Sequence, residues 1–466
     1  MTSPNDYSNL GRIVYANNII TDNLDPRRIR KVIWLLAGSV ALMMTGYGII
    51  MPVFAKRFGE LGSGVGALGL MTMSFALAQL VAAPFMGALA DRIGRRPLVV
   101  VSLAVFALSN VGFLFAPAIA IFILIRTLEG ALTAGLFPAS MGIVADLVPE
   151  NKRAHWIGIV MGSYSAGFIF GPAIGGALYD WQGFSAPFMV SAVFGFLGFV
   201  AACLLVPETR TAKIRNRDRL RGLRNPLHEP IIEPSFLSTL PRPRYIFYTL
   251  MALNFIGSFA FSFIEPQMVF YFYDDLKWST TRFGLVVGVF GLAMVSSQMI
   301  LGRSSDRFGR RPVIVIGFLL SLSFYVGLAY VQLFSLIMVV AFISGVGDAL
   351  KGPAISAFYL DITKKEHRSR IIGIKESALS LGGVLGPALV AIISGRTSPQ
   401  TIFMIGALTT LIGGILALLL LGKQKGGIER DDDAAWALME KRQLAAQACL
   451  HGVVTWAITS RKTRRS

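Results

Sequence analysis

The chain has 466 residues, of which 54% are apolar and only 15% charged, and its mean hydropathy is +0.62. Soluble domains carry about 25% charged residues, so the composition excludes an ordinary soluble fold. The net charge of +18 would suit a nucleic-acid binder, but Lys and Arg occur in short clusters between long apolar stretches. This distribution indicates membrane topology and attraction to lipid headgroups, with no nucleic-acid partner.

Apolar stretches of about 20 residues recur along the chain, and each is long enough to cross a bilayer as a helix. The sequence therefore predicts an all-α membrane protein with twelve transmembrane helices, six in each half. They are predicted near 32–54, 65–90, 97–116, 118–146, 154–179, 184–206, 246–272, 283–301, 312–331, 334–360, 371–394 and 401–421.

Polar and basic segments divide the chain into five parts. We predict an N-terminal segment at 1–31, a six-helix bundle at 32–206, a linker at 207–245, a second bundle at 246–421 and a tail at 422–466. No cleavable signal peptide is visible before the first apolar stretch. If the helices alternate, the basic clusters fall on one side, so both termini and the linker are expected in the cytoplasm and the protein in the cell membrane.

The loop after the second apolar stretch has a copy in the other half. Residues 87–97 read GALADRIGRRP and residues 302–312 read GRSSDRFGRRP, and their acids, Asp91 and Asp306, are 306 − 91 = 215 positions apart. An internal repeat at constant offset dictates architecture. It predicts two pseudo-symmetric six-helix bundles.

We interpret these loops as a latch between the halves. Glycine gives a tight loop its backbone freedom, and a carboxylate at one helix end can accept hydrogen bonds from the N-terminus of another helix. By two-fold symmetry Asp91 would meet the eleventh helix and Asp306 the fifth. The alternative is a basic loop that only sets topology. The predicted latch comprises Asp91, Arg92, Gly94, Arg95 and Arg153, with Asp306, Arg307, Gly309, Arg310 and Arg368.

The fourth apolar stretch contains two charges, Arg126 and Glu129, although burying a charge in the bilayer is costly. At i and i+3 they share one helix face. Protonation of Glu129 would release Arg126, which gives a two-state element for proton coupling. A fixed structural ion pair is the alternative. Ala341 stands at the position of Arg126 in the second half, so the predicted proton site is asymmetric.

The fifth stretch carries a glycine phrase that ends in a proline and a glycine pair. Glycines four residues apart make a flat face for close helix contact, and a proline permits a kink, so we expect a rocking interface. In the second copy Val390 and Ala391 replace the final pair. The phrase comprises Gly158, Gly167, Gly171, Pro172, Gly175 and Gly176.

Further charges lie within the second half. Asp348 and Lys351, again at i and i+3, are predicted as a structural pair, a second proton site or contacts for a charged substrate. Lys375 and Glu376 are weaker substrate-site candidates. Glu265 either attracts a cationic substrate or is a solvated residue near the outer mouth.

Aromatic residues at Tyr47, Phe137, Tyr164 and Phe168 are candidates for an apolar substrate cavity. No catalytic, ATP-binding or metal-ligand spacing is present, so we expect neither an enzyme nor a cofactor. The expected energy source is an ion gradient.

The repeated G-x-x-x-D-R-x-G-R-R loop resembles the signature of the major facilitator superfamily, and the glycine phrase resembles its twelve-helix drug/proton antiporters. The R-x-x-x-G run that begins at Arg126 resembles a motif associated with proton coupling. The resemblance implies a monomer with a central cavity that takes protons and a small-molecule substrate. Our leading hypothesis is a proton-coupled exporter of small hydrophobic or cationic compounds. A nutrient symporter, a lipid or glycolipid flippase and a non-transporting receptor remain as alternatives.

Overall fold

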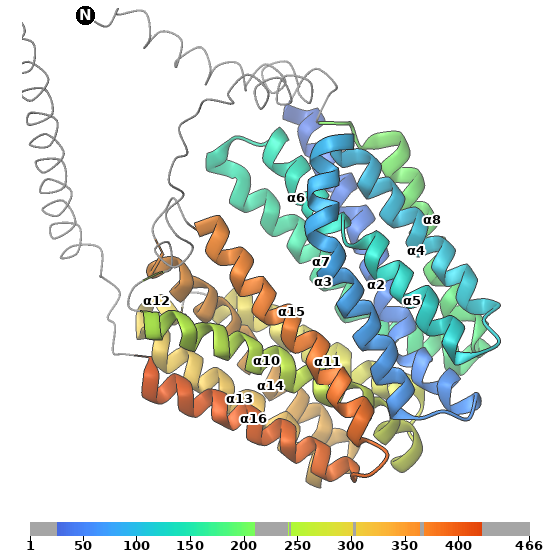
Figure 1. Cartoon of the computed structure of the whole chain (residues 1–466), viewed down its shortest axis with the longest axis vertical. Helices are drawn as coiled ribbons and strands as arrows, with labels where there is room; N and C mark the ends of the chain where they lie inside the picture. The colour runs from blue at the N-terminus through green and yellow to red at the C-terminus, as the bar shows by residue number, and fades with distance from the viewer. Residues whose placement is uncertain (1–25, 210–240, 242–243, 302–303, 364–367, 422–466) are drawn as a thin grey trace, which may run out of the picture.

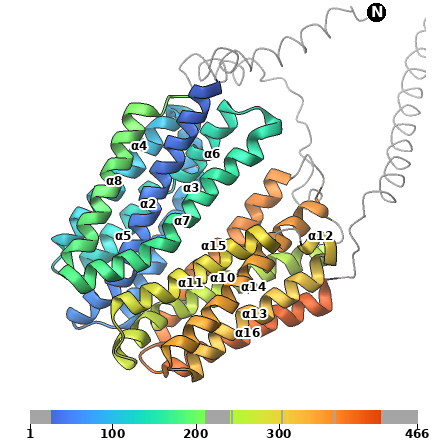
Figure 2. The same cartoon turned by 180° about the vertical axis from the view of Figure 1, so that it is seen from behind.

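The computed structural model describes residues 26–209, 241, 244–301, 304–363 and 368–421, and within these ranges the chain forms helices and no strand (Figure 1). Twelve of these helices or helix pairs are long and apolar enough to span a membrane, which confirms the predicted number. They form two bundles that lie side by side in both views (Figures 1 and 2). The protein is therefore an all-α, multi-pass membrane protein.

The N-bundle contains the helices that precede residue 210. They are α2 (Pro26–Glu60), α3 (Val65–Ile93), α4 (Arg95–Leu114), α5 (Ile119–Thr133), α6 (Leu136–Leu147), α7 (Glu150–Gln182) and α8 (Ser185–Leu205).

The C-bundle contains the helices that follow residue 243, including one π-helical turn. They are α10 (Arg244–Phe270), η2 (Tyr271–Asp275), α11 (Thr280–Leu301), α12 (Ser304–Phe308), α13 (Arg310–Tyr330), α14 (Phe334–Asp361), α15 (Arg368–Ile393) and α16 (Pro399–Leu420).

The fourth apolar stretch, predicted as one helix, consists of two helices. The break falls between Thr133 and Leu136, just before Pro138. Proline lacks an N–H and its ring clashes with the carbonyl four residues earlier, so a helix restarts rather than continues there. The matching Pro353 lies within an unbroken α14, so the two halves differ at this point.

The helices alternate in direction, so the repeated loops lie at the same end of the molecule as the start of α2 and the last residues of α16. We call this the basic end, and the other the opposite end. The loop glycines have positive φ, 116° at Gly94 and 89° at Gly309, which confirms the backbone freedom that the sequence predicts.

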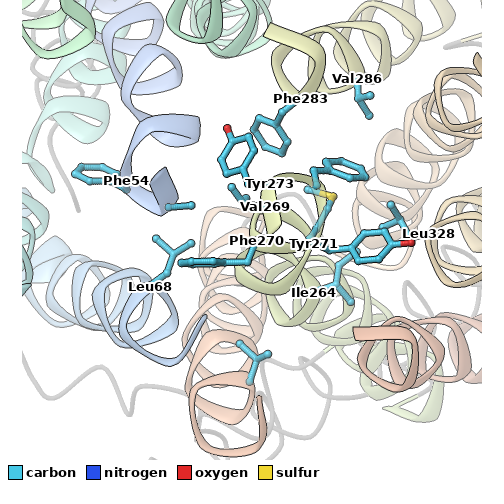
Figure 3. Packing of buried hydrophobic residues seen from close by; sticks show 14 of the residues in the cluster. Phe54, Leu68, Ile264, Val269, Phe270, Tyr271, Tyr273, Phe283, Val286 and Leu328 are labelled. Atoms are coloured by element: carbon cyan, nitrogen blue, oxygen red, sulfur yellow. The ribbon is translucent and has the colours of Figure 1, made fainter. Parts of the chain in front are cut away.

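The buried apolar side chains form different cores at the two ends. Near the basic end each bundle has its own cluster, one around Leu36 and Phe106 in the N-bundle and one around Phe247 and Phe358 in the C-bundle. Near the opposite end one cluster takes side chains from both bundles. Figure 3 shows Leu68 of the N-bundle beside Phe270 of α10. The bundles are thus joined at the opposite end.

Glycine contacts confirm that the closure is one-sided. A side chain at Gly69 of α3 would meet the carbonyl oxygen of Pro387 in α15 at 2.8 Å, and one at Gly176 of α7 would overlap the backbone of Thr280 in α11. Toward the basic end, Gly87 of α3 and Gly158 of α7 face open space. The bundles diverge toward the basic end in Figures 1 and 2. The structure is therefore closed at the opposite end and open at the basic end.

Candidate functional site: a pocket between the bundles

A pocket lies between the two bundles. It is nearer the opposite end, since Leu68 comes from the first turn of α3 and Val269 from the last turn of α10. Most of its wall is aromatic or aliphatic, with one cation and one carboxylate. The lining residues are Tyr47, Met51, Phe54, Leu68, Met71, Thr72, Phe75, Arg126, Glu265, Pro266 and Val269.

The cation of this wall, Arg126, is held in a buried ion pair. Its Nη1 donates to Oε2 of Glu129 at 2.7 Å, and the two side chains are only 5% and 1% exposed. Helix geometry favours this contact, because residues three apart lie on one face. The structure therefore brings together the two residues that the sequence predicts as a pair.

Aromatic rings surround the guanidinium group of Arg126. Its Cζ lies 4.2 Å from the ring centroid of Phe75, 4.5 Å from that of Tyr47 and 5.5 Å from that of Phe54. Ring faces attract cations, and the attraction is stronger when water is excluded. The positive charge of Arg126 is thus stabilised by one carboxylate and three aromatic rings. The carboxylate of Glu129 makes the largest single contribution, so any change at Glu129 alters this stabilisation most.

Glu265 of α10 lines the same pocket from the C-bundle. It does not lie at a solvated outer mouth, because Tyr273, which is buried beyond it, closes the opposite end by donating to the carbonyl oxygen of Pro52 at 3.0 Å. The pocket thus places a carboxylate on one bundle and a cation on the other, with aromatic surface between them. Such a wall can hold an amphipathic or cationic molecule.

The second predicted pair, Asp348 and Lys351, lies between α13 and α14 within the C-bundle. Lys351 Nζ lies 2.5 Å from Asp348 Oδ1 and donates to Ser321 Oγ at 2.9 Å, and Ser321 Oγ donates to Asp348 at 2.6 Å. This triangle is separate from the lining of the pocket. Its side chains are more exposed than the first pair, at 29% for Asp348 and 14% for Lys351.

The weaker substrate-site candidates occupy different places. Phe137 and Tyr164 contact each other, with ring centroids 6.3 Å apart, and both are exposed, whereas Tyr47 lines the pocket. The side chain of Phe168 lies outside the described part of the chain. Lys375 and Glu376 lie on α15, where Lys375 Nζ donates to Glu376 Oε1 at 3.1 Å.

The side chains of each repeated loop form ion pairs within their own bundle. Arg95 pairs with Asp146 at 2.7 Å, and Arg310 pairs with Asp361 at 2.8 Å; both members of the second pair lie 215 positions after those of the first. Arg310 also contacts Asp306 at 2.5 Å. The architectural repeat therefore extends to side-chain contacts.

The proposed latch between the bundles stays a prediction. The side chains of Asp91, Arg153 and Arg368 lie outside the described part of the structure. In this structure Asp306 contacts Arg310 of its own bundle. Arg92, which follows Asp91, and Arg307, which follows Asp306, are both exposed.

The glycine phrase of α7 has two structural roles. Side chains at Gly167 and Gly171 would both meet the backbone of α2 at 2.6 Å, and one at Gly175 would overlap the backbone of Ile49. Gly176 approaches Thr280 of the C-bundle, and Pro172 of the same phrase approaches Gly284 of α11, where a side chain would overlap the carbonyl oxygen of Pro172. The three glycines thus fix α7 to α2, whereas Pro172 and Gly176 belong to the side of α7 that approaches the C-bundle.

Sequence reasoning missed two carboxylates that bind the start of another helix. Glu208 accepts from the backbone N–H groups of Arg95 and Arg96, each at 3.2 Å. Asp180 of α7 accepts from the N–H of Thr281 at 2.9 Å and from its hydroxyl at 2.6 Å, and also contacts Thr280. The repeat gave no signal for either, since the positions 215 later hold Lys423 and Gly395.

A family model described as the Major Facilitator Superfamily matches residues 36–273 and 247–460, which together cover most of the chain. The chain belongs to the Major Facilitator Superfamily. It is therefore a membrane transporter rather than an enzyme.

Bacterial multidrug resistance proteins are among the proteins that this chain resembles. A Lactococcus lactis protein named multi-drug resistance efflux pump PmrA homolog is 27% identical over 303 residues, which are 63% of this chain and 70% of that protein. The multidrug resistance protein MdtG of Klebsiella pneumoniae is 24% identical over 315 residues, 67% of this chain and 73% of that one.

A solved structure of a bacterial homolog to the human lysosomal transporter Spinster, described as inward-facing and occupied, supports the same fold. It aligns with a TM-score of 0.70 and 15% identity over 85% of this chain and 97% of that one. At this identity the similarity concerns the fold alone. It confirms the two-bundle architecture of a major facilitator.

Proposed function

We propose that this major facilitator is a proton-coupled antiporter that exports small hydrophobic or cationic compounds. The observation that carries the proposal is the buried Arg126–Glu129 pair in the wall of a pocket shared by both bundles. A charge pair is expensive at membrane depth and marks ion or substrate pathways. The names of the PmrA and MdtG relatives support efflux of drug-like compounds.

The coupling step follows from the balance of charge around Arg126. When Glu129 is ionised, the pair is neutral and the guanidinium is occupied. When Glu129 takes a proton, Arg126 loses its ion-pair partner and keeps the contacts with the rings of Tyr47, Phe54 and Phe75. Its charge then repels a cationic substrate from the pocket. Proton and substrate therefore exclude each other, as antiport requires.

The basic end is proposed to face the cytoplasm. Lys and Arg accumulate in cytoplasmic loops, and the described loops at 92–96 and 307–311 hold six arginines in all. In this orientation the structure opens toward the cytoplasm, where an exporter collects its substrate. The membrane potential then contributes about 2.3 kcal/mol per 100 mV for each net charge moved.

The test measures proton movement across the membrane of liposomes that contain the protein. The purified protein is reconstituted, a pH gradient is imposed, and internal pH is followed while ethidium or another lipophilic cation is added. We expect substrate-dependent proton movement in the wild type and its loss in Glu129→Gln. Asp348→Asn is the matched control, because it removes a carboxylate of an ion pair outside the pocket.

Two outcomes would contradict the proposal. One is proton-driven transport with unchanged pH dependence in Glu129→Gln. The other is loss of proton coupling in Asp348→Asn alone, which would move the coupling site into the C-bundle.

A further inference from the structure

Glu129 is not reached directly from the pocket between the bundles. Arg126 lines that pocket, whereas Glu129 lies outside the lining and its side chain is only 1% exposed. A hydronium ion that came through the pocket would have to pass the guanidinium group, and a fixed positive charge of this kind excludes protons from narrow pores. Proton transfer to Glu129 therefore needs another route, inside the N-bundle.

The helix that carries Glu129 is interrupted one turn further along the chain, near the middle of the span Ile119–Leu147. In the described chain the N–H groups of Ala134 and Gly135 donate to no backbone carbonyl, and Pro138 has no N–H. The carbonyl groups four residues before these three positions thus lack the donors of a continuous helix. Hydrocarbon offers such groups no partner, so at this depth they are satisfied by protein or by water.

Buried hydroxyl groups continue the line of Glu129 across the interruption. Thr133 follows Glu129 by four residues and Ser140 follows it by eleven, which is about three helical turns. Ala134 and Gly135 keep right-handed helical dihedral angles, so the three side chains share one face. Thr133 is 5% and Ser140 is 1% exposed, and the hydroxyl of Ser140 has no hydrogen-bond partner among the described residues. An unpaired buried hydroxyl is costly, and a water molecule beside it removes the cost.

The interruption is packed against α3 and α4. A side chain at Gly135 would meet Leu98 of α4 at 2.7 Å and Met86 of α3 at 3.4 Å. Ser102 of α4, which is fully buried, donates to the carbonyl oxygen of Leu132 at 3.4 Å. The interruption is thus enclosed by helices of one bundle, and α4 adds a third hydroxyl group beside it.

The line of hydroxyl groups leads toward water at the basic end. Asp146 of α6, six residues beyond Ser140, pairs with Arg95 at 2.7 Å and is 31% exposed, so water reaches a carboxylate there. The helices α3 and α4, which pack against α5, carry titratable residues only in their turns at the basic end. These residues are Asp91, Arg92, Arg95 and Arg96.

The C-bundle keeps its matching helix intact. α14 runs through Pro353 without a break, and Asp348 and Lys351 take the positions of Thr133 and Leu136, since 348 − 133 = 215 and 351 − 136 = 215. The two charged side chains form an ion pair across one turn, which supports a helix. The interruption is therefore a property of the N-bundle, the half with the proposed proton site.

We propose that the interruption between α5 and α6 binds water and forms the route by which protons reach Glu129 from the basic end. This rests on the proposed function, because it concerns access to the same carboxylate. A proton passes from hydronium at the basic end along hydrogen-bonded water to the carboxylate of Glu129, which accepts it. Thr133 and Ser140 are positioning residues that hold this water. The substrate uses the space between the bundles, so proton and substrate arrive by separate ways.

The first measurement is hydrogen–deuterium exchange of backbone amides in the detergent-solubilised protein, read by mass spectrometry. We expect residues 134–137 to exchange about a hundredfold faster than residues 349–352 of α14, because hydrogen-bonded helix amides exchange only when the helix opens. In Pro138→Ala the added N–H lets α5 and α6 join, so exchange at 134–137 should slow. Pro353→Ala, at the matching position of the unbroken helix, is the control and should exchange like the wild type.

The second measurement is the rate at which Glu129 takes a proton. After a rapid drop in pH, time-resolved infrared spectroscopy follows the protonated carboxyl band that Glu129→Gln lacks. Thr133→Val and Ser140→Ala each remove a hydroxyl group that holds water, so the rate should fall about tenfold while the midpoint pH of the band stays unchanged. Thr133→Ser keeps the hydroxyl group and should retain the wild-type rate.

Thr127→Val is the matched control on α5. Thr127 donates to the carbonyl oxygen of Ile123, four residues earlier, just as Thr133 donates to that of Glu129. Because Thr127 lies two residues before Glu129, it points to the other side of the helix. The rate in this variant should equal that of the wild type, and a fall as large as in Thr133→Val would contradict the route.

Equal exchange of residues 134–137 and 349–352 in the wild type would overturn the inference. An unchanged infrared rate in both Thr133→Val and Ser140→Ala would also overturn it, as would an unchanged rate in a Pro138→Ala variant whose exchange has slowed. If ethidium moves no protons in liposomes while these rates change as expected, the proposed antiport fails and the route remains. The two proposals therefore fail by different measurements.

Discussion

The two ends of this transporter differ in how the bundles meet. At the opposite end one apolar cluster draws on both bundles, and Asp180 of the N-bundle binds the first residues of α11. At the basic end each bundle has its own core, and the described contacts of Arg95 and Arg310 stay within one bundle. The contacts of the opposite end are therefore the ones that must break when the transporter opens there.

The largest effect is expected from Gly176→Leu. A side chain at this position would overlap the backbone of Thr280, which cannot move without separating α7 from α11. Overpacking costs about 1–3 kcal/mol, so the opposite end should open in most molecules. Labelling of a cysteine placed at Val286, which is buried in the shared cluster, should become faster.

Gly158→Leu is the control on the same helix. Nothing lies within 4 Å of a side chain at Gly158 in this state, so the labelling rate at Val286 should stay that of the wild type. Equal labelling in the two leucine variants would show that the close approach of Gly176 does not hold the opposite end closed.

Asp180→Ala should have the next largest effect. It removes a charged acceptor from the backbone and hydroxyl groups of Thr280 and Thr281. Hydrogen bonds to charged groups contribute about 1.5–3 kcal/mol, and partial exposure here lowers that value, so a shift of about tenfold toward the open opposite end is expected. Spin-label distances across the opposite end would measure it.

Glu60→Gln tests whether the shift in Asp180→Ala comes from losing a contact between the bundles. The alternative is that loss of any carboxylate at the opposite end has the same effect. Glu60 bonds to Arg57 and Tyr179, which both belong to the N-bundle. The distance distribution of this variant should match the wild type. A shift as large as that of Asp180→Ala would contradict our assignment.

A smaller change is expected from Tyr273→Phe. The variant loses only the hydrogen bond from the tyrosine hydroxyl to the carbonyl oxygen of Pro52, while the ring remains in the shared cluster. The net contribution of such a bond is about 1 kcal/mol, so the closed population should fall less than in Asp180→Ala. Tyr271→Phe, whose ring packs on Phe403 within the C-bundle, should leave the distances unchanged.

Arg310→Ala should leave the populations of molecules open at the basic end and open at the opposite end almost unaltered. Its partners Asp361, Ser305 and Asp306 all lie in the C-bundle, so the loss should lower the melting temperature of the detergent-solubilised protein instead. Arg307→Ala, at an exposed neighbouring position, is the control for melting. A large change in inter-bundle distance in Arg310→Ala would indicate a latch across the basic end.

Much of the fold was predictable because its signals are periodic or repeated. Apolar length set the twelve spans, and the 215-residue offset set the two bundles. The Arg126–Glu129 pair was predictable because residues three apart on a helix must share a face. The break before Pro138 was missed because a proline alone does not decide between a break and a continuous helix, as the matching Pro353 inside the unbroken α14 shows. The roles of Asp180 and Glu208 were missed because each depends on which helix lies opposite, a tertiary property without local pattern.

One repeated contact bears on how the chain matures. Arg96 donates to the carbonyl oxygen of Cys203, and Arg311 donates to that of Leu418, each across 107 positions. The third membrane helix of each half is thereby fastened to its sixth. Each half thus holds its third and sixth helices together by its own bonds, so the first half has these contacts available before the second is synthesised.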